Sequence, residues 1–234
     1  MNNNTTNKYK YTVIILCYHR SRELVDMARK CVQSVLDSCD RDITEIVLVD
    51  NGSTMGAEWT MADTYIKVPQ QRGCAGGWNL GINVARGKYI NILGDDTIVQ
   101  KGWLDKMSAM FEIPQVGITN VHVQNLPKYE GIMENYRWFS YACFMLQRKT
   151  IDRIGLFDEQ YFPVNYEDTD YSTRILKAGL KMYVDYSMTI AHLEGQTSKA
   201  DDLKAGFDAN KERYMKKWGF DPIPVFYQDK PFPF

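Results

Sequence analysis

The chain has 234 residues and a formal net charge of −1, with 44% apolar and 24% charged side chains. This length and composition are typical of one water-soluble α/β domain, and the balanced charge excludes the overall basic footprint of a nucleic-acid-binding domain. The five cysteines form no CxxC pair and no metal-like spacing, which indicates reduced thiols in a cytosol-like compartment. No secretory signal and no membrane-spanning apolar run is evident. We therefore expect a cytoplasmic protein, with peripheral contact to a membrane as the open alternative.

Buried strands and amphipathic helices alternate over the N-terminal part of the chain. The run YTVIILCY is almost wholly apolar and β-branched, which favours a strand buried on both faces, and Ser21 is a suitable N-cap for the helix that follows. We expect, after a disordered polar tail 1–9, strand 11–18, helix 21–38, strand 45–50, strand 64–68, helix 75–86 and strand 89–93. This alternation with short links predicts a doubly wound, mostly parallel sheet flanked by helices.

The regular alternation ends after Asp96. The expected elements beyond it are helix 102–111, strands 116–123 and 138–146, helices 149–154 and 169–178, short strands 182–187 and 189–193, and a charged helix 198–218. No Gly-, Pro- or Ser-rich linker interrupts the chain, so we expect a single domain over residues 10–219. The tail 220–234 carries four of the eight prolines, which predicts no regular helix there and favours a segment that wraps the core.

Polar side chains follow three of the expected parallel strands where each strand ends. They are Tyr18, His19 and Arg20 after the first, Asp50 and Asn51 after the second, and Asp95 and Asp96 after the fourth. Ligands of open parallel sheets bind beyond the carboxyl ends of the strands, so we expect these residues at one edge. A divalent cation explains the adjacent carboxylates Asp95 and Asp96, and a helix N-terminus explains them equally well. Asp50 is either a turn former or a hydrogen-bond acceptor for a base or ribose.

A glycine-rich segment, residues 71–87, opens the expected helix that precedes the acidic pair. Gly73, Gly76 and Gly77 permit close approach of a phosphate to the helix N-terminus. The spacing matches neither a P-loop nor GxGxxG, and a turn with tight helix–sheet packing is the alternative interpretation.

A second acidic segment, NYEDTDYSTRILKAG, opens the expected helix 169–178. The positive end of that helix is expected to lower the pKa of Glu167, Asp168 and Asp170, and for Asp170 simple helix capping is the preferred interpretation. His192 ends a short apolar strand, where it is either a metal ligand or a structural imidazole.

Taken together, five segments resemble family 2 glycosyltransferases of the GT-A fold, especially the rhamnosyltransferase-like and galactofuranosyltransferase-like members. They are VIILCYHR, EIVLVDNGST, RGCAGGWNLGINVARGKYINILGDDT, GLFDEQYFPVNYEDTDYSTRILKAGLKMYV and AHLEG, in family order over roughly residues 10–195. The resemblance implies a Rossmann-like central sheet, with residues 10–97 as the nucleotide-binding half and residues 98–219 as the acceptor and catalytic half. The first strand departs from the usual Pro-Thr-Tyr-Asn-like ending, because Cys17, Tyr18 and His19 stand there.

The resemblance also implies an inverting transfer from a UDP- or dTDP-sugar that depends on Mn²⁺ or Mg²⁺. Asp168 is the implied catalytic base, Asp96 and His192 are the implied metal ligands, and Trp138 is a candidate for stacking on an acceptor sugar. Gly94 stands where a full DxD motif has its first acid. The implied nucleotide-sugar contacts are Tyr18, Arg20, Asp50, Asn51, Arg72, Gly76, Gly77, Asn79, Asp95 and Glu167.

Several classes of acceptor molecule are compatible with the sequence. A surface glycan, a lipid-linked sugar or another hydroxyl compound is favoured over a protein or a modified base in nucleic acid. The last helix offers basic residues for nucleic acid, interleaved with acids that favour a solvated face instead: Lys199, Lys204, Lys211, Arg213, Lys216 and Lys217. A sugar nucleotidyltransferase is less favoured because CYHRSREL lacks a Gly-rich signature, and a sugar-binding module without activity is disfavoured by Asp96, Asp168 and His192. Because the chain is short for the family, a homodimer is a further possibility.

Overall fold

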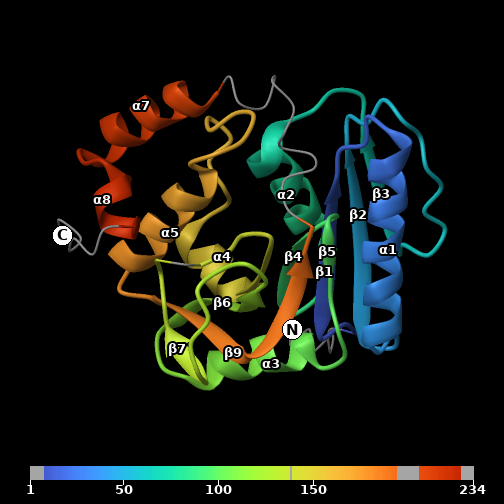
Figure 1. Ribbon diagram of the computed structural model, residues 1–234, viewed down its shortest axis with the longest axis horizontal. Helices are drawn as coiled ribbons and strands as arrows, with labels where there is room; N and C mark the ends of the chain where they lie inside the picture. Colours follow the sequence, from blue (N-terminus) through green and yellow to red (C-terminus); the bar gives the residue numbers. More distant parts are fainter. Residues whose placement is uncertain (1–7, 138, 194–205, 228–234) are drawn as a thin grey trace, which may run out of the picture.

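A computed structural model describes residues 8–137, 139–193 and 206–227 (Figure 1). The strands are β1 Tyr11–Cys17, β2 Thr44–Asn51, β3 Thr64–Val68, β4 Tyr89–Gly94, β5 Thr97–Ile98, β6 Val116–Val123, β7 Ile132–Glu134, β8 Cys143–Gln147 and β9 Lys181–His192. The helices are α1 Arg22–Ser38, α2 Gly73–Val84, α3 Trp103–Ala109, α4 Arg148–Ile154, α5 Glu167–Lys177, α7 Phe207–Trp218 and α8 Pro222–Tyr227, with a 3₁₀ turn at Met110–Glu112. None of the helices in these ranges is long and apolar enough to cross a membrane.

The strands form one sheet in the order β3-β2-β1-β4-β8-β6-β9-β5, and β7 pairs with β9. Strands β3, β2, β1 and β4 are parallel, with Ile14 opposite both Val47 and Ile92. Strand β8 then runs antiparallel to β4 and to β6, while β6 and β9 are parallel. The expectation of parallel strands is therefore confirmed for the N-terminal part, and the sheet as a whole is mixed.

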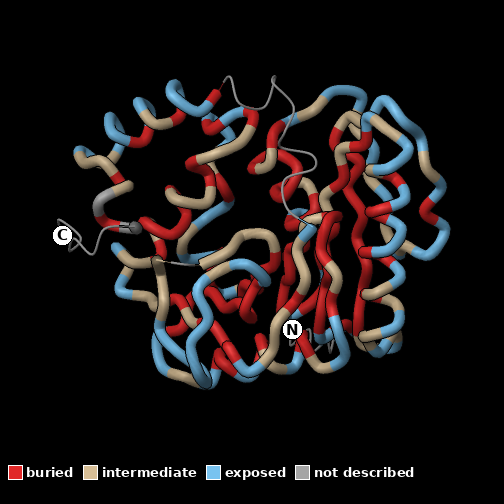
Figure 2. Tube along the Cα trace, viewed as in Figure 1, coloured by how far each residue is buried: buried red, intermediate tan, exposed pale blue. Residues whose placement is uncertain are grey.

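Helices cover both faces of the sheet, and successive side chains of each central strand point to opposite faces. Val13 and Ile15 pack with α1 and α3 on one face, whereas Ile14 packs with α2, α4 and α5 on the other. Because both faces are covered, the central strands β1, β2, β4, β6 and β8 are buried along almost their whole lengths, as Figure 2 shows, whereas β3 and β7 are more exposed. This two-sided burial explains why the strand sequences are continuous apolar runs.

Several element boundaries differ from those expected. The strand expected over 138–146 begins only at Cys143, and the two short strands near 182–193 are one strand, β9. The β6–β9 register is irregular between Val121 and His122: their partners on β9 are Asp185 and Thr189, so three residues of β9 are skipped before pairing resumes. The short strands β5 and β7 were not expected. In the tail expected to be disordered, Tyr9 is packed with 8% of its surface exposed, and residues 1–7 lie outside the described ranges.

The C-terminal segment contains a short helix where none was expected. Pro222 is the first residue of α8, a position whose N–H needs no partner and where proline is favoured. Helices α7 and α8 lie beside α5 (Figure 1). Tyr161, Tyr166 and Tyr214 form a small apolar cluster there, with Phe220 packed against it. Up to residue 227, the tail therefore packs on the domain, and of the expected helix 198–218 the described part is α7.

Candidate active site

A cavity of about 350 Å³ lies at the carboxyl ends of β1 and β4 and faces the start of α5. Seven of the predicted site residues line it: Tyr18, Asn51, Asp95, Asp96, Glu167, Asp168 and His192. They come from the ends of β1, β2, β4 and β9 and from the first turn of α5. Residues far apart in the sequence thus converge on one cavity, as the rule for parallel sheets predicts.

Asp95 is the inner carboxylate of the acidic pair after β4. Its Oδ2 lies 3.0 Å from Nε2 of the buried His19. Burial raises the pKa of Asp95, while the hydrogen bond to His19 opposes that rise. The backbone N–H of His19 donates to Ser53 Oγ at 2.7 Å, which fixes the ring beneath the cavity. His19 was not among the predicted site residues, and its place at a strand end beside Tyr18 was the available signal.

Asp96 is the outer carboxylate, and it meets His192 across the cavity. The distance from Asp96 Oδ1 to His192 Nε2 is 3.2 Å. Short antiparallel pairing between β5 and β9 sets Thr97 opposite His192, and the backbone N–H of Leu193 donates to Asp96 O at 2.9 Å. A Cβ at Gly94 would lie 2.9 Å from Asp96 Oδ1. A side chain at position 94 therefore crowds the Asp96 carboxylate, which accounts for the glycine.

Glu167 and Asp168 open α5 on the opposite wall. Asn165 and Tyr166, just before them, have φ of 78° and 74°, a left-handed conformation that non-glycine residues adopt at a cost. Asp168 is half-buried, and its Oδ1 accepts from the backbone N–H of Thr169 at 2.6 Å and from its hydroxyl at 3.2 Å. These constraints fix the direction of the Asp168 carboxylate.

The electrostatics of this wall differ from the expectation. Burial raises the pKa of Asp168, and burial together with the neighbouring Asp168 charge raises the pKa of Glu167 well above its ordinary value. Glu167 is only 3% exposed, and its Oε2 accepts no hydrogen bond from any described residue. The expected lowering of the pKa by the helix end is therefore wrong for both residues, because the loss of hydration outweighs the helix dipole.

Two sets of side chains offer donor atoms for a metal ion. The donor atoms of Cys17, His19 and Asp95 all lie within 4.8 Å of one another. Burial and the nearby carboxylates raise the pKa of the Cys17 thiol well above its ordinary value, which disfavours the thiolate that binds metals. Asp96 and His192 instead open on the cavity, and their oxygen and nitrogen donors fit a divalent cation that also contacts a ligand.

Asp50 and Asn51 hold loops around the cavity. Asp50 does not line it, because its carboxylate accepts from the Ser53 N–H at 2.9 Å and from the Tyr65 hydroxyl at 3.0 Å. This arrangement favours the turn-former interpretation. Asn51 accepts from the N–H of Arg72 at 2.9 Å and donates to the carbonyl oxygen of Gly73 at 3.0 Å. Asn51 therefore links the end of β2 to the glycine-rich segment while it lines the cavity.

The glycines and Asn79 of helix α2 are held by packing, while Cys74 and Trp78 of the same helix line the cavity. A Cβ at Gly77 would lie 2.4 Å from Leu16 Cδ1, and a Cβ at Gly76 would lie 2.8 Å from Arg72 Cβ. Asn79 donates to the Phe157 carbonyl at 2.9 Å and accepts from the Phe157 N–H at 3.0 Å. None of Gly76, Gly77 and Asn79 lines the cavity, so the structure favours tight helix–sheet packing as their role.

The remaining predicted residues lie at or beyond the rim. The Arg20 guanidinium is 5.3 Å from the Tyr18 ring centroid, and Arg72 is half-exposed with its Nη2 3.9 Å from Glu159 Oε2. Neither arginine lines the cavity, and Trp138 lies outside the described residues. Ser140 and Tyr141, which no motif indicated, also line the cavity, and so does Cys74, to which the glycine-rich segment gave no role.

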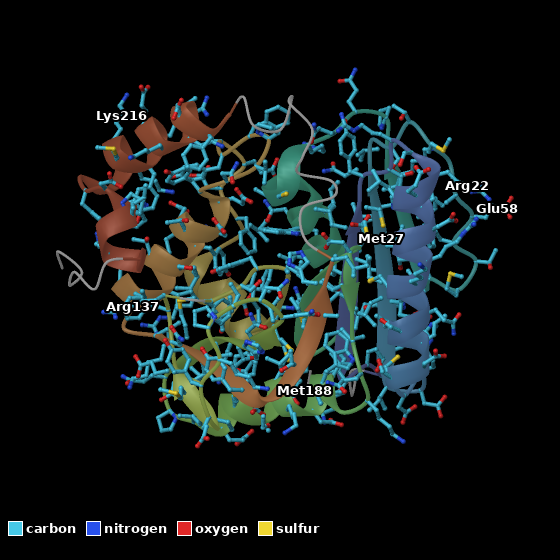
Figure 3. All side chains as sticks on the ribbon, viewed as in Figure 1. Arg22, Met27, Glu58, Arg137, Met188 and Lys216 are labelled. Carbon is cyan, nitrogen blue, oxygen red and sulfur yellow. The ribbon has the colours of Figure 1, made fainter. Side chains whose placement is uncertain are left out.

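Asp170 and the basic residues of α7 form ion pairs within the fold. Asp170 is fully buried and does not cap α5. It accepts from Trp218 Nε1 at 2.9 Å and lies 2.7 Å from Lys217 Nζ. Lys211 pairs with Asp221 at 3.0 Å, whereas Lys216 points away from the molecule (Figure 3). Lys199 and Lys204 lie outside the described residues. The pairing of Lys211 and Lys217 with carboxylates favours a structural role over a nucleic-acid interface.

Known proteins share both the sequence pattern and the fold. A family model described as "Glycosyl transferase family 2" matches residues 12–167. The chain is 29% identical over 136 residues to Glycosyltransferase GlyG of Streptococcus pneumoniae serotype 4, covering 55% of this chain and 42% of that protein. It is 20% identical over 220 residues to O-antigen biosynthesis protein RfbC of Myxococcus xanthus, covering 76% of this chain and 17% of that protein.

A solved structure confirms the architecture. The crystal structure of GalNAc-T7 with UDP, GalNAc and Mn²⁺ superposes with a TM-score of 0.69 at 15% identity, covering 95% of this chain and 50% of that chain. At this identity the likeness shows the fold, which is the expected GT-A type with a central sheet flanked by helices. The chain spans less than half the length of the curated relatives that it matches.

Proposed function

Because this chain belongs to glycosyl transferase family 2, we propose that it transfers a sugar from a nucleoside-diphosphate-sugar to an acceptor hydroxyl with inversion at the anomeric carbon. One observation carries the proposal: Asp96, His192 and Asp168, which lie on three different elements or loops, all line one cavity. An acid suited to proton transfer and a donor set suited to a cation thus face the same space.

Asp168 is the proposed base. A base works best when its pKa lies near the working pH, and burial moves the pKa of Asp168 upward in that direction. In a single displacement, the acceptor oxygen forms a bond to the anomeric carbon while the bond from that carbon to the phosphate oxygen breaks. The acceptor proton passes to Asp168, and the electron pair leaves with the nucleoside diphosphate. Thr169 holds Asp168 Oδ1 through two hydrogen bonds, which keeps the carboxylate directed during the transfer.

Asp96 and His192 are the proposed ligands of a divalent cation. Their separation of 3.2 Å lets one ion contact both. Mg²⁺ strongly prefers oxygen ligands, so an imidazole in the donor set disfavours Mg²⁺. When bound, such an ion supplies positive charge to the departing diphosphate. The GalNAc-T7 crystal contained UDP and Mn²⁺, which supports this assignment and a uridine donor by analogy.

Tyr18 and Asn51 are the proposed contacts of the donor's nucleoside, because both line the cavity beside the ends of β1 and β2. Asp95 and Glu167 lie deeper and are nearly fully buried. We propose that Asp95 and Glu167 form the floor of the cavity and that their charges influence the neighbouring Asp96 and Asp168. The O-antigen biosynthesis relative supports a surface-glycan product.

A thermal-shift panel tests this proposal. UDP-, dTDP- and GDP-sugars are each added with Mn²⁺ and, separately, with a chelator. Ligand at 100-fold above Kd stabilises a native protein by about 2.7 kcal/mol, which for this size corresponds to a Tm rise of roughly 5–10 °C. We expect one nucleotide to give such a rise with Mn²⁺ only.

Two variants control this experiment. Asp96→Ala is expected to remove the Mn²⁺-dependent rise, and Asp152→Ala, which changes an exposed acid on α4, is expected to retain it. A rise that persists in the chelator, or in Asp96→Ala with Mn²⁺, contradicts the metal assignment. No rise with any of the sugars contradicts the donor assignment itself.

A further inference from the structure

A second cavity, of about 260 Å³, lies next to the first. Its lining residues are Asn165, Tyr166, Asp168, Thr169, Phe207, Pro222 and Ile223. Among the residues that the structure describes, Asp168 alone lines both cavities. The proposed base therefore stands between two spaces, and a transferase that moves a group from donor to acceptor needs a second substrate on the far side of its base.

The second cavity has a wall that the structure holds in place. Asp221 Oδ1 accepts from the backbone N–H of Ile223 at 3.0 Å, and Asp221 Oδ2 pairs with Lys211 Nζ of α7 at 3.0 Å. The phenyl ring of Phe220 packs against Tyr214 with a centroid distance of 5.6 Å. These contacts tie the first turn of α8 to α7.

Helix α7 is in turn fixed to the segment before α5. The buried Asn210 donates from Nδ2 to the carbonyl oxygens of Val164 and Asn165, at 3.1 Å and 3.0 Å. A Cβ at Gly206 would lie 2.6 Å from Pro163 Cδ, so the start of α7 lies tightly against this segment. The cavity is thus enclosed by α5, α7 and α8, which were expected from the sequence to be a helix, a charged helix and an irregular tail.

The residues that line the second cavity indicate which kind of ligand it binds. Phe207 offers an aromatic ring that is 43% exposed, set edge-on to Tyr166 at 5.2 Å, and Pro222 and Ile223 add apolar surface. Asn165, Thr169 and Asp168 add polar groups, and no described lining residue is cationic. A phosphate or nucleic-acid backbone finds no positive partner there and meets the Asp168 carboxylate. A neutral sugar offers hydroxyls for the polar groups and an apolar ring face for Phe207.

From this placement we propose that the second cavity binds the acceptor, and that the acceptor end is an uncharged sugar residue. Its apolar face lies on Phe207, its far side contacts Ile223, and its reacting hydroxyl reaches Asp168 at the boundary with the donor cavity. The volume is near the lower end of small-molecule sites, about 300 Å³, which suits one sugar residue. The inference rests on the proposed function, and it makes α8 part of the substrate site.

Ile223→Trp tests the inference by filling the cavity, and Met215→Trp is the matched control on the exposed part of α7. The probes are p-nitrophenyl glycosides of common hexoses, with hexose 1-phosphates as the anionic comparison. We expect Ile223→Trp to lower kcat/KM for the glycosides at least ~10-fold, the scale of a pocket misfit, while the Tm rise with donor and Mn²⁺ persists. Met215→Trp is expected to behave like the wild type in both assays.

A second variant keeps the test valid if Ile223→Trp does not fold. Phe207→Ala removes a side chain that is already partly exposed, and it is expected to raise the KM for glycosides about 3–10-fold, the usual worth of an aromatic contact. Wild-type transfer by Ile223→Trp and Phe207→Ala, with the donor response intact, overturns the acceptor assignment and leaves the proposed function standing. Preferred transfer to hexose 1-phosphates overturns the uncharged class. Loss of the donor response in the wild type overturns the proposed function instead.

Discussion

Two pairs of adjacent carboxyl groups line opposite walls of the cavity. The two pairs differ in the side chains that offset their negative charge. In the β4 pair, Asp95 and Asp96, each carboxylate has an imidazole within reach, at 3.0 Å for His19 and 3.2 Å for His192. In the α5 pair, Glu167 has an oxygen with no partner among the described residues, and Asp168 is held by neutral groups of Thr169.

This difference separates two chemical roles. In the β4 pair, His19 opposes the rise that burial gives the pKa of Asp95, and Asp96 with His192 presents an oxygen and a nitrogen donor that suit the holding of a cation. A buried carboxyl group with only neutral partners holds its proton more tightly, and such groups serve as acids and bases near neutral pH. Adjacent acids at a strand end and at a helix start therefore look alike in the sequence and act differently in the fold.

The largest expected effect is on turnover, through the α5 pair. Asp168→Asn keeps the shape of the side chain and removes its basicity. We expect kcat to fall by about 10²–10⁴-fold, the usual contribution of a general base, while the Tm rise with donor and Mn²⁺ remains. Steady-state transfer assays measure the fall, and Asp152→Asn on the exposed face of α4 is the matched control. Turnover within tenfold of the wild type contradicts the assigned role of Asp168.

The next effect is on stability, through the β4 pair. His19→Ala leaves the Asp95 carboxylate buried without its imidazole, and we expect the free energy of unfolding at pH 7 to fall by about 3 kcal/mol. In the double variant with Asp95→Asn, the uncompensated charge is gone, so part of the loss should be recovered. Urea denaturation of the two single variants and the double variant measures this coupling. Additive losses in the double variant contradict the compensation of Asp95 by His19.

The smallest effect, measured over one pH unit, is a pH dependence that belongs to Glu167. Its pKa is raised well above the ordinary value of 4.5 by burial and by Asp168, so above pH 4.5 the folded chain binds more protons than the unfolded chain. Stability is therefore fully present below this pH and falls as pH rises, by about 1.4 kcal/mol per pH unit until the folded carboxyl ionises.

Glu167→Gln removes this titration. Relative to the wild type, the variant is expected to gain stability as pH rises above about 4.5 until the folded wild-type carboxyl ionises, with no relative change below pH 4.5. Urea midpoints of both proteins at a series of pH values measure the difference. A stability difference that stays constant over the whole series contradicts the raised pKa of Glu167.

The parallel strands and the carboxylates at their ends were accessible from the sequence for a common reason. Strands β1, β2 and β4 are buried on both faces, so each is a largely apolar run, with polar residues at its end or directly after it. Because parallel strands share one edge, the positions of Asp95 and Asp96 followed from the strand pattern alone. The part beyond β4 was less accessible, since β8 pairs antiparallel with the distant β4 and β9 pairs with β6 in an irregular register.

Among the candidate site residues, those that bind backbone groups of distant loops were the least predictable. Asn79 lies in a segment that resembles a ligand-binding motif, and only its contacts with Phe157 show a structural role. His19 stands in the segment VIILCYHR at a strand end, but its pairing with Asp95 joins residues 76 positions apart and is shown only by the structure. Local sequence patterns do not indicate which distant atoms form hydrogen bonds with a given side chain.

The sequence by itself therefore determined the family, the parallel strands of the N-terminal part and the identity of the acidic residues, because these follow from local periodicity and from motif order. Only the tertiary structure decided which carboxylates are compensated, how burial moves the pKa of Glu167 and Asp168, and that α8 encloses a second cavity beside Asp168. The physical reason is that hydration loss and charge pairing depend on the distances between residues that are far apart along the chain.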